Sequence, residues 1–211
     1  RDNFDIIHSI GIRSFQSFIA ALISKKKKIP LVISDQGGLT THPELTASLF
    51  KKILVKIQEP FINFIIKSAT KISVPNEYEK NIFLEYCDES KITVIPNGIN
   101  LDIKNSPILD FKKKYNIPSN FVLFLGRFSK IKGLDILLQS IHILKKQLTD
   151  KKIKFIIMGV DFGFETEMLN TIRNLNISEL VSVIKNPPRE DVIQAYRESN
   201  FLVYPSRWEL S

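Results

Sequence analysis

The sequence predicts an α/β protein with two parallel β-sheets covered by helices. Short apolar runs without polar alternation, such as Phe121–Leu125, are typical of strands buried on both faces of a parallel sheet. These runs alternate along the chain with segments whose apolar residues recur at helical spacing, which is the pattern of βαβ units. The alternation breaks once, in the polar stretch 97–107. We therefore predict two βαβ domains, residues 1–103 and 104–211, with a ligand cleft between them.

The first block reads as strands and helices in turn. Strands are expected at residues 5–8, 31–33, 71–74 and 92–95, and helices at 12–26 and 76–86. Pro43 suits the first turn of a helix that runs to about Gln58. Because proline is disfavoured inside a helix, Pro60 is expected to begin a separate helix over residues 60–68.

The second block continues the same alternation. Strands are expected at residues 121–125, 153–158, 181–184 and 201–204. Helices are expected at 107–115, 164–174 and 190–198, and after Gly133, where leucines and isoleucines recur on one face. The order of elements predicts parallel strands with helices on both faces of the sheet.

Composition excludes several classes of protein. An apolar content of 44% and a charged content of 25% are those of a globular protein, not of a disordered one. The formal net charge of +8 favours anionic partners such as nucleotide phosphates, nucleic acid or acidic lipid. One cysteine allows no intrachain disulfide and indicates a cytoplasmic setting. No apolar run approaches the ~20 residues of a membrane span, and no signal peptide is visible.

Both ends of the sequence indicate an internal fragment. There is no initiator Met, a strand pattern begins almost at once, and the last residues stop just after a strand, in the middle of a turn.

Several catalytic motifs are absent from the sequence. It contains no Walker A loop, no Gly-x-Gly-x-x-Gly, no Gly-x-Ser-x-Gly and no Asp-x-Asp pair. The three histidines, His8, His42 and His142, are too far apart for metal-ligand spacing. We therefore expect a site without metal or cofactor, which relies on cations and helix dipoles.

Polar residues converge on one edge of the second predicted sheet. Arg127 and Lys132 follow strand 121–125, and Glu209 follows strand 201–204. Parallel strands place their carboxyl ends on the same side, where open α/β sheets bind ligands. Two cations, a helix N-terminus and a carboxylate suit a ligand with a diphosphate and a hydroxyl-rich group. The alternative is that these are solvated loop residues without a ligand.

These residues resemble a known family. Gly126-Arg127-Phe128 with Lys132-Gly133, and Pro205-Ser206 with Glu209, are similar to motifs of the retaining glycosyltransferases of family 4 (group 1). The stretch 94–99 is similar to the interdomain crossing of that family. The resemblance covers nearly the whole chain and implies the GT-B fold, with two Rossmann-like domains facing a cleft, both incomplete here.

The resemblance implies a role for each site residue. The donor, a nucleotide-diphosphate sugar, would bind the C-terminal domain, with its diphosphate on Arg127 and Lys132. Glu209 resembles the first glutamate of the family's Glu-x7-Glu motif, which contacts the donor sugar; the second would fall beyond residue 211. The loop Lys185, Asn186 and Pro187 would lie against the nucleobase.

The chain departs from the family pattern at two loops. Gln36 stands where a catalytic His is expected, so His42, six residues further on, is the candidate for that role. The alternative for His42 is a polar residue at a helix start, before Pro43. With Gly37, Asn97 and Gly98, Gln36 is expected to line the interdomain cleft. The usual Gly-x-Gly is replaced by residues 159–163, so that loop is expected to be rearranged.

Residues 49–67 combine a basic and an apolar pattern. Leu49, Phe50, Ile53, Leu54, Ile57, Phe61, Phe64 and Ile65 recur at helical spacing among Lys51, Lys52, Lys56 and Lys67. Such a helix can lie on an acidic membrane, or it can cover the sheet with its lysines in solvent. Lipid-linked acceptors are common in the family that the chain resembles.

The expected function is the transfer of a hexose from a nucleotide sugar to an acceptor hydroxyl, with retention and without a metal. The acceptor would be a glycan or a lipid-linked molecule, and the fragment alone is expected to be inactive. A sugar-nucleotide-binding or scaffold module that has lost catalysis is the alternative, because Gln36 replaces the expected His. A nucleic-acid binder is disfavoured, since the lysines are dispersed without aromatic residues among them.

Overall fold

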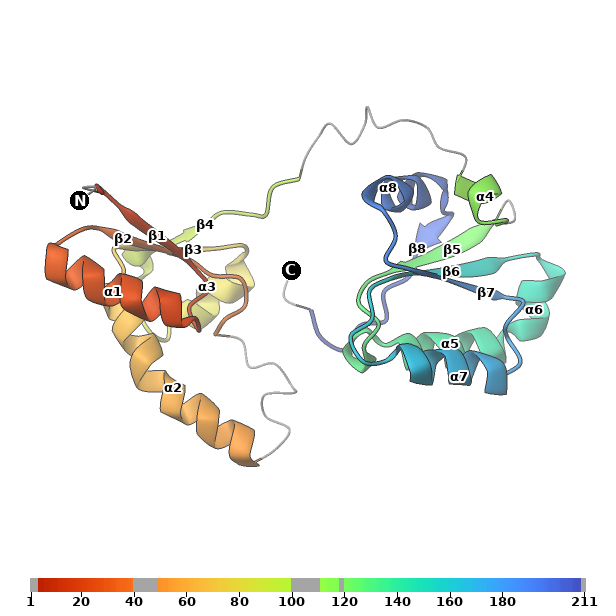
Figure 1. Ribbon diagram of the computed structural model, residues 1–211, viewed down its shortest axis with the longest axis horizontal. Coiled ribbons are helices and arrows are strands. Elements are labelled where there is room, and N and C mark those ends of the chain that lie inside the picture. Colours follow the sequence, from red (N-terminus) through yellow and green to blue (C-terminus); the bar gives the residue numbers. More distant parts are fainter. Residues whose placement is uncertain (1–3, 40–48, 100–110, 118–119, 210–211) are drawn as a thin grey trace. The chain divides into compact units, whose positions relative to one another are not determined.

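The computed structural model describes residues 4–39, 49–99, 111–117 and 120–209. The chain forms two compact units, Arg1–Ile99 with Leu210–Ser211, and Asn100–Glu209. Each unit holds a four-stranded sheet in which every pair of neighbouring strands is parallel (Figure 1). The predicted α/β fold class is confirmed.

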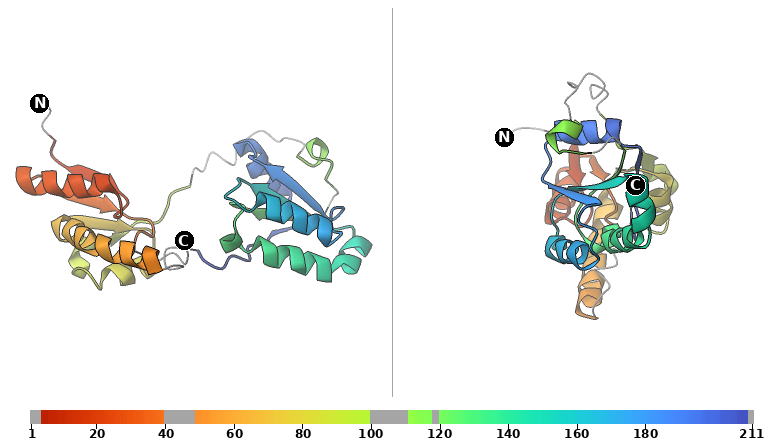
Figure 2. Two further views of the ribbon diagram at one scale, coloured as in Figure 1. Left: turned by 60° about the horizontal axis from the view of Figure 1, so that its bottom comes forward. Right: turned by 90° about the vertical axis from the view of Figure 1, so that its right-hand side faces the viewer.

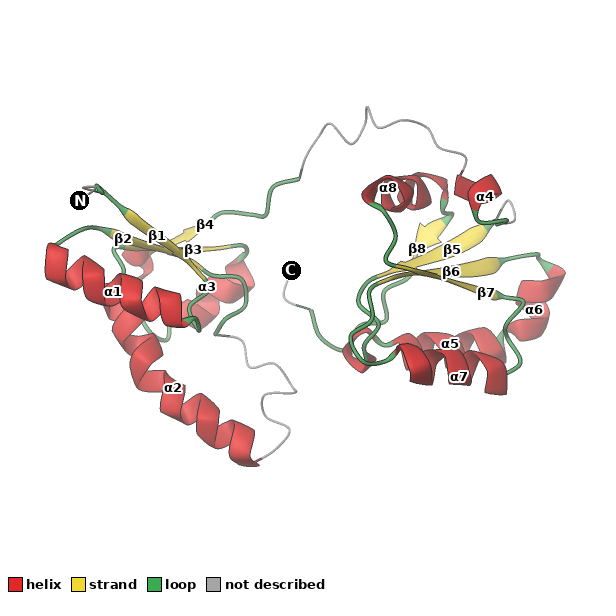
Figure 3. Ribbon diagram, in the orientation of Figure 1, coloured by secondary structure: helices red, strands yellow, loops and turns green. Residues whose placement is uncertain are grey.

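The N-terminal unit alternates strands and helices along the chain. Its elements are β1 (Ile7–Ile10), α1 (Phe15–Lys27), β2 (Leu31–Ser34), α2 (Leu49–Ser68), β3 (Lys71–Val74), α3 (Glu77–Phe83), η2 (Glu89–Lys91) and β4 (Ile92–Val94). The strands lie in sequence order in the sheet, β1-β2-β3-β4, which is the result of successive crossovers through the helices shown in red in Figure 3.

One face of the N-terminal sheet packs against the core of its unit. Leu31 and Ile33 of β2 are inaccessible to solvent and pack in one core with residues of α1, α2 and α3. The alternate residues of β2, Val32 and Ser34, face the opposite side of the sheet. There, Ser34 forms hydrogen bonds with His8 (2.7 Å) and with Ser73 (3.1 Å) across three strands. The prediction of helices on both faces is therefore wrong for the described part of this unit, because that second face carries polar side chains.

One continuous helix, α2, replaces the two helices predicted around Pro60. A proline inside a helix costs about 3 kcal/mol because it removes a backbone hydrogen bond and crowds the preceding turn. Tertiary packing offsets that cost here. Ile62, Ile65 and Ile66 lie in the core just after Pro60, and Phe18 contacts both Phe61 and Phe64.

The C-terminal unit follows the predicted order of elements. They are α4 (Phe111–Lys114), β5 (Phe121–Leu125), η4 (Lys130–Lys132), α5 (Leu134–Ile143), α6 (Lys145–Asp150), β6 (Lys154–Gly159), α7 (Glu165–Asn174), β7 (Val181–Lys185), α8 (Arg189–Glu198) and β8 (Phe201–Leu202). The sheet order is β7-β6-β5-β8. Strand β8 is shorter than predicted, and residues 107–110 of the predicted helix 107–115 lie outside the described residues.

Both faces of the C-terminal sheet are covered, as predicted. Val122 and Phe124 of β5 point into a core with α5 and α7. Phe121 and Leu123 point into a second core with α4 and α8. Figure 2 shows the two helix layers on opposite sides of this sheet. Because β5 is buried on both faces, its position is strongly determined, and it carries the loop that begins the candidate site.

No helix among the described residues is both long enough and apolar enough to cross a lipid bilayer.

Candidate functional site

Lys132 and Glu209 form an ion pair at the carboxyl ends of β5 and β8, which are paired in parallel. The Lys132 ammonium donates hydrogen bonds to both carboxylate oxygens of Glu209, at 2.6 and 2.7 Å. The Lys132 side chain is only 11% exposed, whereas that of Glu209 is 37% exposed. The structure thus brings together two of the residues predicted to act at one site.

Lys132 is positioned by the turn that precedes α5. It is the last residue of η4, and Gly133 follows with a φ of +70°, in the left-handed region that favours glycine. The carbonyl of Pro205 packs directly on Gly133, where a Cβ would lie 2.0 Å from the carbonyl oxygen. The backbone N–H of Arg207 also donates to the carbonyl of Ile131 (2.8 Å). The segment that carries Glu209 is therefore seated on the turn that carries Lys132.

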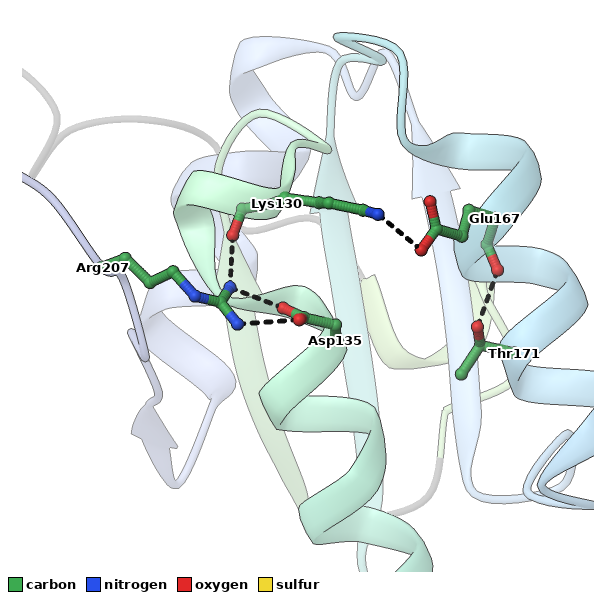
Figure 4. Close-up of polar contacts among 5 residues, drawn as sticks. All are labelled: Lys130, Asp135, Glu167, Thr171 and Arg207. Atoms are coloured by element: carbon green, nitrogen blue, oxygen red, sulfur yellow. Dashed lines mark hydrogen bonds and ion pairs between the residues drawn. The ribbon is translucent and has the colours of Figure 1, made fainter. Parts of the chain in front are cut away.

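Arg207 fastens the same two segments together (Figure 4). Its guanidinium forms a bidentate pair with Asp135 of α5, at 2.7 and 2.8 Å, and donates to the carbonyl of Lys130. The pair with Arg207 lowers the pKa of the Asp135 carboxyl. The side chain of Lys130 reaches the other way, to Glu167 of α7 at 3.0 Å.

Tyr204 links Lys132 to the loop that carries Arg127. The tyrosine ring stacks on Phe124 of β5, and the Lys132 ammonium lies 5.3 Å from the ring centroid. Its hydroxyl lies near Gly126, the residue before Arg127. The exposed guanidinium of Arg127 lies 5.0 Å from the ring of Phe162. Arg127 thus offers its N–H donors at the rim of the site, and Lys132 offers its charge from a more enclosed position.

The N-terminus of α7 is capped by a carboxylate of the chain. Oδ1 of Asp161 accepts hydrogen bonds from the backbone N–H groups of Gly163 (2.9 Å), Phe164 (3.0 Å) and Glu165 (3.0 Å). These bonds, that of Glu165 first, lower the pKa of Asp161. This end of α7 therefore already holds a negative charge, which leaves the N-terminus of α5, next to Lys132, as the helix end predicted to favour phosphate.

The loop after β7 lies beside the same helix end. Lys185 forms an ion pair with Glu165, which raises the pKa of the lysine. The N–H of Asn186 donates to the carbonyl of Gly159 at 2.8 Å, and Asn186 adopts a positive φ of 49°. Pro187 follows at half exposure. The assignment of these three residues to the nucleobase stays a prediction.

In the N-terminal unit, two residues predicted to line the cleft are in contact. The Gln36 side-chain amide donates to the Asn97 side-chain oxygen at 2.9 Å. Gly37 has a φ of +80°, and its N–H donates to Glu79 of α3. Gly98 is exposed. His42, the other catalytic candidate, lies outside the described residues.

Two buried carboxyl groups hold the loop that carries Gln36. Asp35 accepts from the N–H groups of Ile12 (2.9 Å) and Gly38 (2.8 Å), and Glu79 accepts from Gly37 (2.8 Å). Both side chains are 2% exposed. Burial raises the pKa of each carboxyl, and the nearby charge of Asp35 raises that of Glu79 further. Oε1 of Glu79 has no hydrogen-bond partner among the described residues.

We expect Glu79→Gln to leave the protein equally stable or more stable at neutral pH. The amide oxygen can replace Oε2 as acceptor from Gly37, while the variant avoids burying a charge. Because the folded-state pKa is raised, the folded state binds more protons than the unfolded state between the two pKa values. Glu79 therefore favours folding below its unfolded pKa, and that advantage is lost as pH rises through the folded pKa. Urea unfolding across this pH range should show a weaker pH dependence in Glu79→Gln.

Asp35→Asn is the matched comparison. Both oxygens of Asp35 accept hydrogen bonds, so an amide would direct an N–H group at a backbone donor. We expect Asp35→Asn to lose about 1–3 kcal/mol at neutral pH. An equal loss of stability in Glu79→Gln and Asp35→Asn would contradict this expectation, because it would show that the negative charge of Glu79 stabilises the folded state.

No group of three or more His, Cys, Asp or Glu side chains that could hold a metal ion lies in the described ranges. Sequence reasoning missed Tyr204, the Arg207–Asp135 pair and the Asp161 cap. The cap had a local signal, since an aspartate shortly before an acidic first helical turn is a common N-terminal arrangement. The Arg207–Asp135 pair had none, because its partners are 72 residues apart.

Two protein-family models match complementary parts of the chain. The Glycosyltransferase Family 4 model matches residues 1–103, and the Glycosyl transferases group 1 model matches residues 107–210. The chain belongs to the family 4, group 1 glycosyltransferases. This glycosyltransferase chain is 27% identical over 209 residues to an uncharacterised glycosyltransferase of Methanocaldococcus jannaschii, covering 99% of the chain and 51% of that protein. It is 25% identical over 155 residues to a D-inositol 3-phosphate glycosyltransferase of Corynebacterium kroppenstedtii, covering 67% of the chain and 34% of that protein.

Solved structures show the same fold. The crystal structure of Anabaena HepE in complex with UDP and glucose matches with a TM-score of 0.72 at 19% identity, over 98% of the chain and 54% of HepE. Sucrose-phosphate synthase from Thermosynechococcus elongatus matches with a TM-score of 0.70 at 16% identity, over 99% of the chain and 52% of that protein. The glycosyltransferase chain therefore has the GT-B fold and spans about half the length, or less, of the relatives that it matches.

Proposed function

We propose that the whole protein transfers a hexose from a nucleotide-diphosphate sugar to an acceptor hydroxyl, with retention and without a metal. The observation that carries the proposal is the enclosed Lys132 ammonium beside Glu209, at the carboxyl ends of parallel strands. Lys132 and Arg127 would offset the charge that develops on the leaving diphosphate. Glu209 would accept hydrogen bonds from the donor sugar. The solved relative HepE, whose crystal structure holds UDP and glucose, supports a nucleotide sugar as the donor.

The acceptor side of the reaction belongs to the N-terminal unit in this proposal. Gln36, Gly37, Asn97 and Gly98 would face the acceptor, which is a glycan or a lipid-linked hydroxyl compound.

With a single cysteine, Cys87, and no disulfide framework, the sequence supports a cytoplasmic location.

The test is turnover by the full-length protein. It would be incubated with a panel of nucleotide sugars, with and without EDTA, and release of the nucleoside diphosphate would be measured by chromatography. We expect release that EDTA does not reduce, and a product whose anomeric configuration, read by NMR, is that of the donor. Loss of turnover with EDTA would contradict metal independence, and an inverted anomer would contradict retention.

The second candidate is a nucleotide-sugar-binding module without catalysis. Gln36, in the position where the family usually has a catalytic His, is already hydrogen-bonded to Asn97. Calorimetric binding of a nucleoside diphosphate together with no turnover of any donor would favour this second function. Neither binding nor turnover would contradict both candidates.

Arg207 is a positioning residue in the proposed reaction. Arg207→Ala removes the bidentate pair to Asp135 and the bond to the Lys130 carbonyl, so residues 204–209 lose a fastening to the turn before α5. Because small displacements of catalytic groups are costly, we expect kcat to fall about 10- to 100-fold. Arg207→Lys, which cannot form the bidentate pair, should recover only part of kcat.

The control is Arg173→Ala on α7. Arg173 is an exposed arginine of the same unit, and its guanidinium donates hydrogen bonds to Leu169 and Asn170 of its own helix. Its replacement should leave kcat unchanged. If Arg207→Ala lowered the unfolding temperature but not kcat, the pair would be a stabilising contact without a positioning role.

A further inference from the structure

The N-terminal half of α2 and the turn that follows it, residues 49–61, expose a continuous set of apolar side chains. We call this set the α2 stripe; it consists of Leu49, Phe50, Ile53, Leu54, Ile57 and Phe61. Each is between 43% and 76% exposed. Residues at these spacings share one side of a helix. Figure 1 and Figure 2 both show this half of α2 extending beyond the sheet of its unit. The stripe is therefore a contiguous exposed apolar patch, and patches of this kind mark interaction sites.

The rest of α2 holds the stripe in a fixed place. Ile62, Ile65 and Ile66 are at most 4% exposed and lie in the core of the N-terminal unit. Phe61, at the end of the stripe, contacts Phe18 of α1 with ring centroids 5.3 Å apart. Arg13 donates to Gln58 at 3.1 Å. The helix is thus anchored by its second half and presents its first half on a rigid support.

Lysines accompany the stripe. Lys52 and Lys56 are exposed and lie one turn apart, so that both follow the same side of the helix. The first acidic residue of α2 is Glu59, after ten residues of the helix. The described surface of this helix half is therefore apolar and basic, and the whole chain has a formal net charge of +8. A partner complementary to this surface is apolar and carries anionic groups at its edge.

The composition of the stripe distinguishes between two kinds of partner. The centres of protein–protein interfaces are depleted in lysine, because burying the ammonium costs free energy. At a membrane surface the same lysine extends its apolar stem along the helix and places its ammonium at the lipid phosphates. An anionic lipid surface thus satisfies both the apolar side chains and the lysines.

We propose that the N-terminal half of α2 binds the surface of an anionic membrane. The helix lies in the plane of the interface, with the α2 stripe among the upper acyl chains and Lys52 and Lys56 at the phosphates. The proposal rests on the exposure and charge of α2 alone, and does not depend on the proposed transfer reaction.

The test is co-sedimentation of the full-length protein with vesicles. Vesicles of phosphatidylcholine alone are compared with vesicles that also contain phosphatidylglycerol, at low and high salt. We expect binding to the anionic vesicles that weakens with salt. Phe50→Ser with Ile57→Ser should lower the partition coefficient at least about tenfold on the anionic vesicles. Lys52→Glu with Lys56→Glu should lower binding about tenfold or more on anionic vesicles and little on neutral ones.

A matched control lies at the junction of α5 and α6. Ile143 and Leu144 are exposed apolar residues, followed by the exposed Lys145 and Lys146. The same serine and glutamate substitutions there should leave vesicle binding unchanged. If the wild type does not sediment with anionic vesicles, or if the α2 variants and the control variants bind equally well, the proposal is overturned. A large fall in unfolding temperature in Phe50→Ser with Ile57→Ser would mean that other parts of the full-length protein cover the stripe, which also overturns it.

Discussion

Lys132→Ala in the full-length protein is expected to lower kcat for donor turnover about 100- to 1,000-fold, the usual loss when one group that stabilises developing charge is removed. Lys132 is held for that role. Its ammonium lies between the ring of Tyr204 and the carboxylate of Glu209, in a position that is largely shielded from water. A charge in such a place acts more strongly on a neighbouring charge than one in bulk solvent.

Lys130→Ala is the matched control for Lys132→Ala. Lys130 lies in the same turn, but its side chain is 64% exposed and pairs with Glu167. We expect turnover within about twofold of the wild type, because exposed ion pairs contribute little. Arg127→Ala, at the exposed rim, should lower kcat less than Lys132→Ala does, because solvent screens a charge at that position. Equal turnover in Lys132→Ala and Lys130→Ala would remove Lys132 from the reaction.

Lys132→Met separates charge from packing. Methionine retains an unbranched apolar side chain of similar length, so the contact with Tyr204 is largely kept while the charge is lost. If the charge is what acts, Lys132→Met should be as slow as Lys132→Ala, with an unfolding temperature near that of the wild type. Recovery of turnover in Lys132→Met would show that the lysine acts by filling space.

Gly133→Ala is expected to cause the largest loss of stability, about 2–5 kcal/mol in the free energy of unfolding. Two costs add at this residue. Its φ of +70° costs a residue with a Cβ about 1–2 kcal/mol. The new methyl group would also lie 2.0 Å from the carbonyl oxygen of Pro205, so the segment 204–209 must shift, and overpacking of this kind costs about 1–3 kcal/mol.

Gly163→Ala isolates the first of these costs, the backbone strain. Gly163 has a similar φ of +86°, but nothing lies within 4 Å of the position that its Cβ would take. We expect Gly163→Ala to lose only about 1–2 kcal/mol, the strain of the backbone alone. Urea unfolding gives both losses, and the fluorescence of Trp208, the only tryptophan of the sequence, reports on the shifted segment. Equal losses of unfolding free energy in the two variants would show that Pro205 moves away from the new methyl group without a cost in stability.

The apolar pattern was sufficient to predict the fold class. Runs such as Phe121–Leu125, followed by residues at helical spacing, correctly predicted the order of strands and helices and the parallel pairing of both sheets. Parallel pairing then predicted that Lys132 and Glu209 would share an edge, and the structure shows them as an ion pair. The predicted bounds of helices and strands were less accurate. The apolar pattern of a sequence fades over a few residues, whereas an element ends where its packing and its backbone hydrogen bonds end.

Long-range packing overruled the sequence at two elements. Pro60 was expected to separate two helices, but the core contacts of Ile62, Ile65 and Ile66 stabilise a single helix. The apolar run 31–33 was predicted to be a strand covered by helices on both faces, yet one face of β2 carries Ser34 in hydrogen bonds with His8 and Ser73. A run of three residues is too short to show whether polar residues alternate with it on the neighbouring strands.

The sequence by itself determined which residues stand at the ends of strands, because strands and their order follow from local apolar periodicity. Only the tertiary structure decided how those residues are held. Arg207 and Asp135 meet across 72 residues, Gly133 must be a glycine because Pro205 packs on it, and α2 exposes its first half while burying its second. Each of these depends on which surfaces meet after folding, and contacts between distant segments leave no periodic signal in a single sequence.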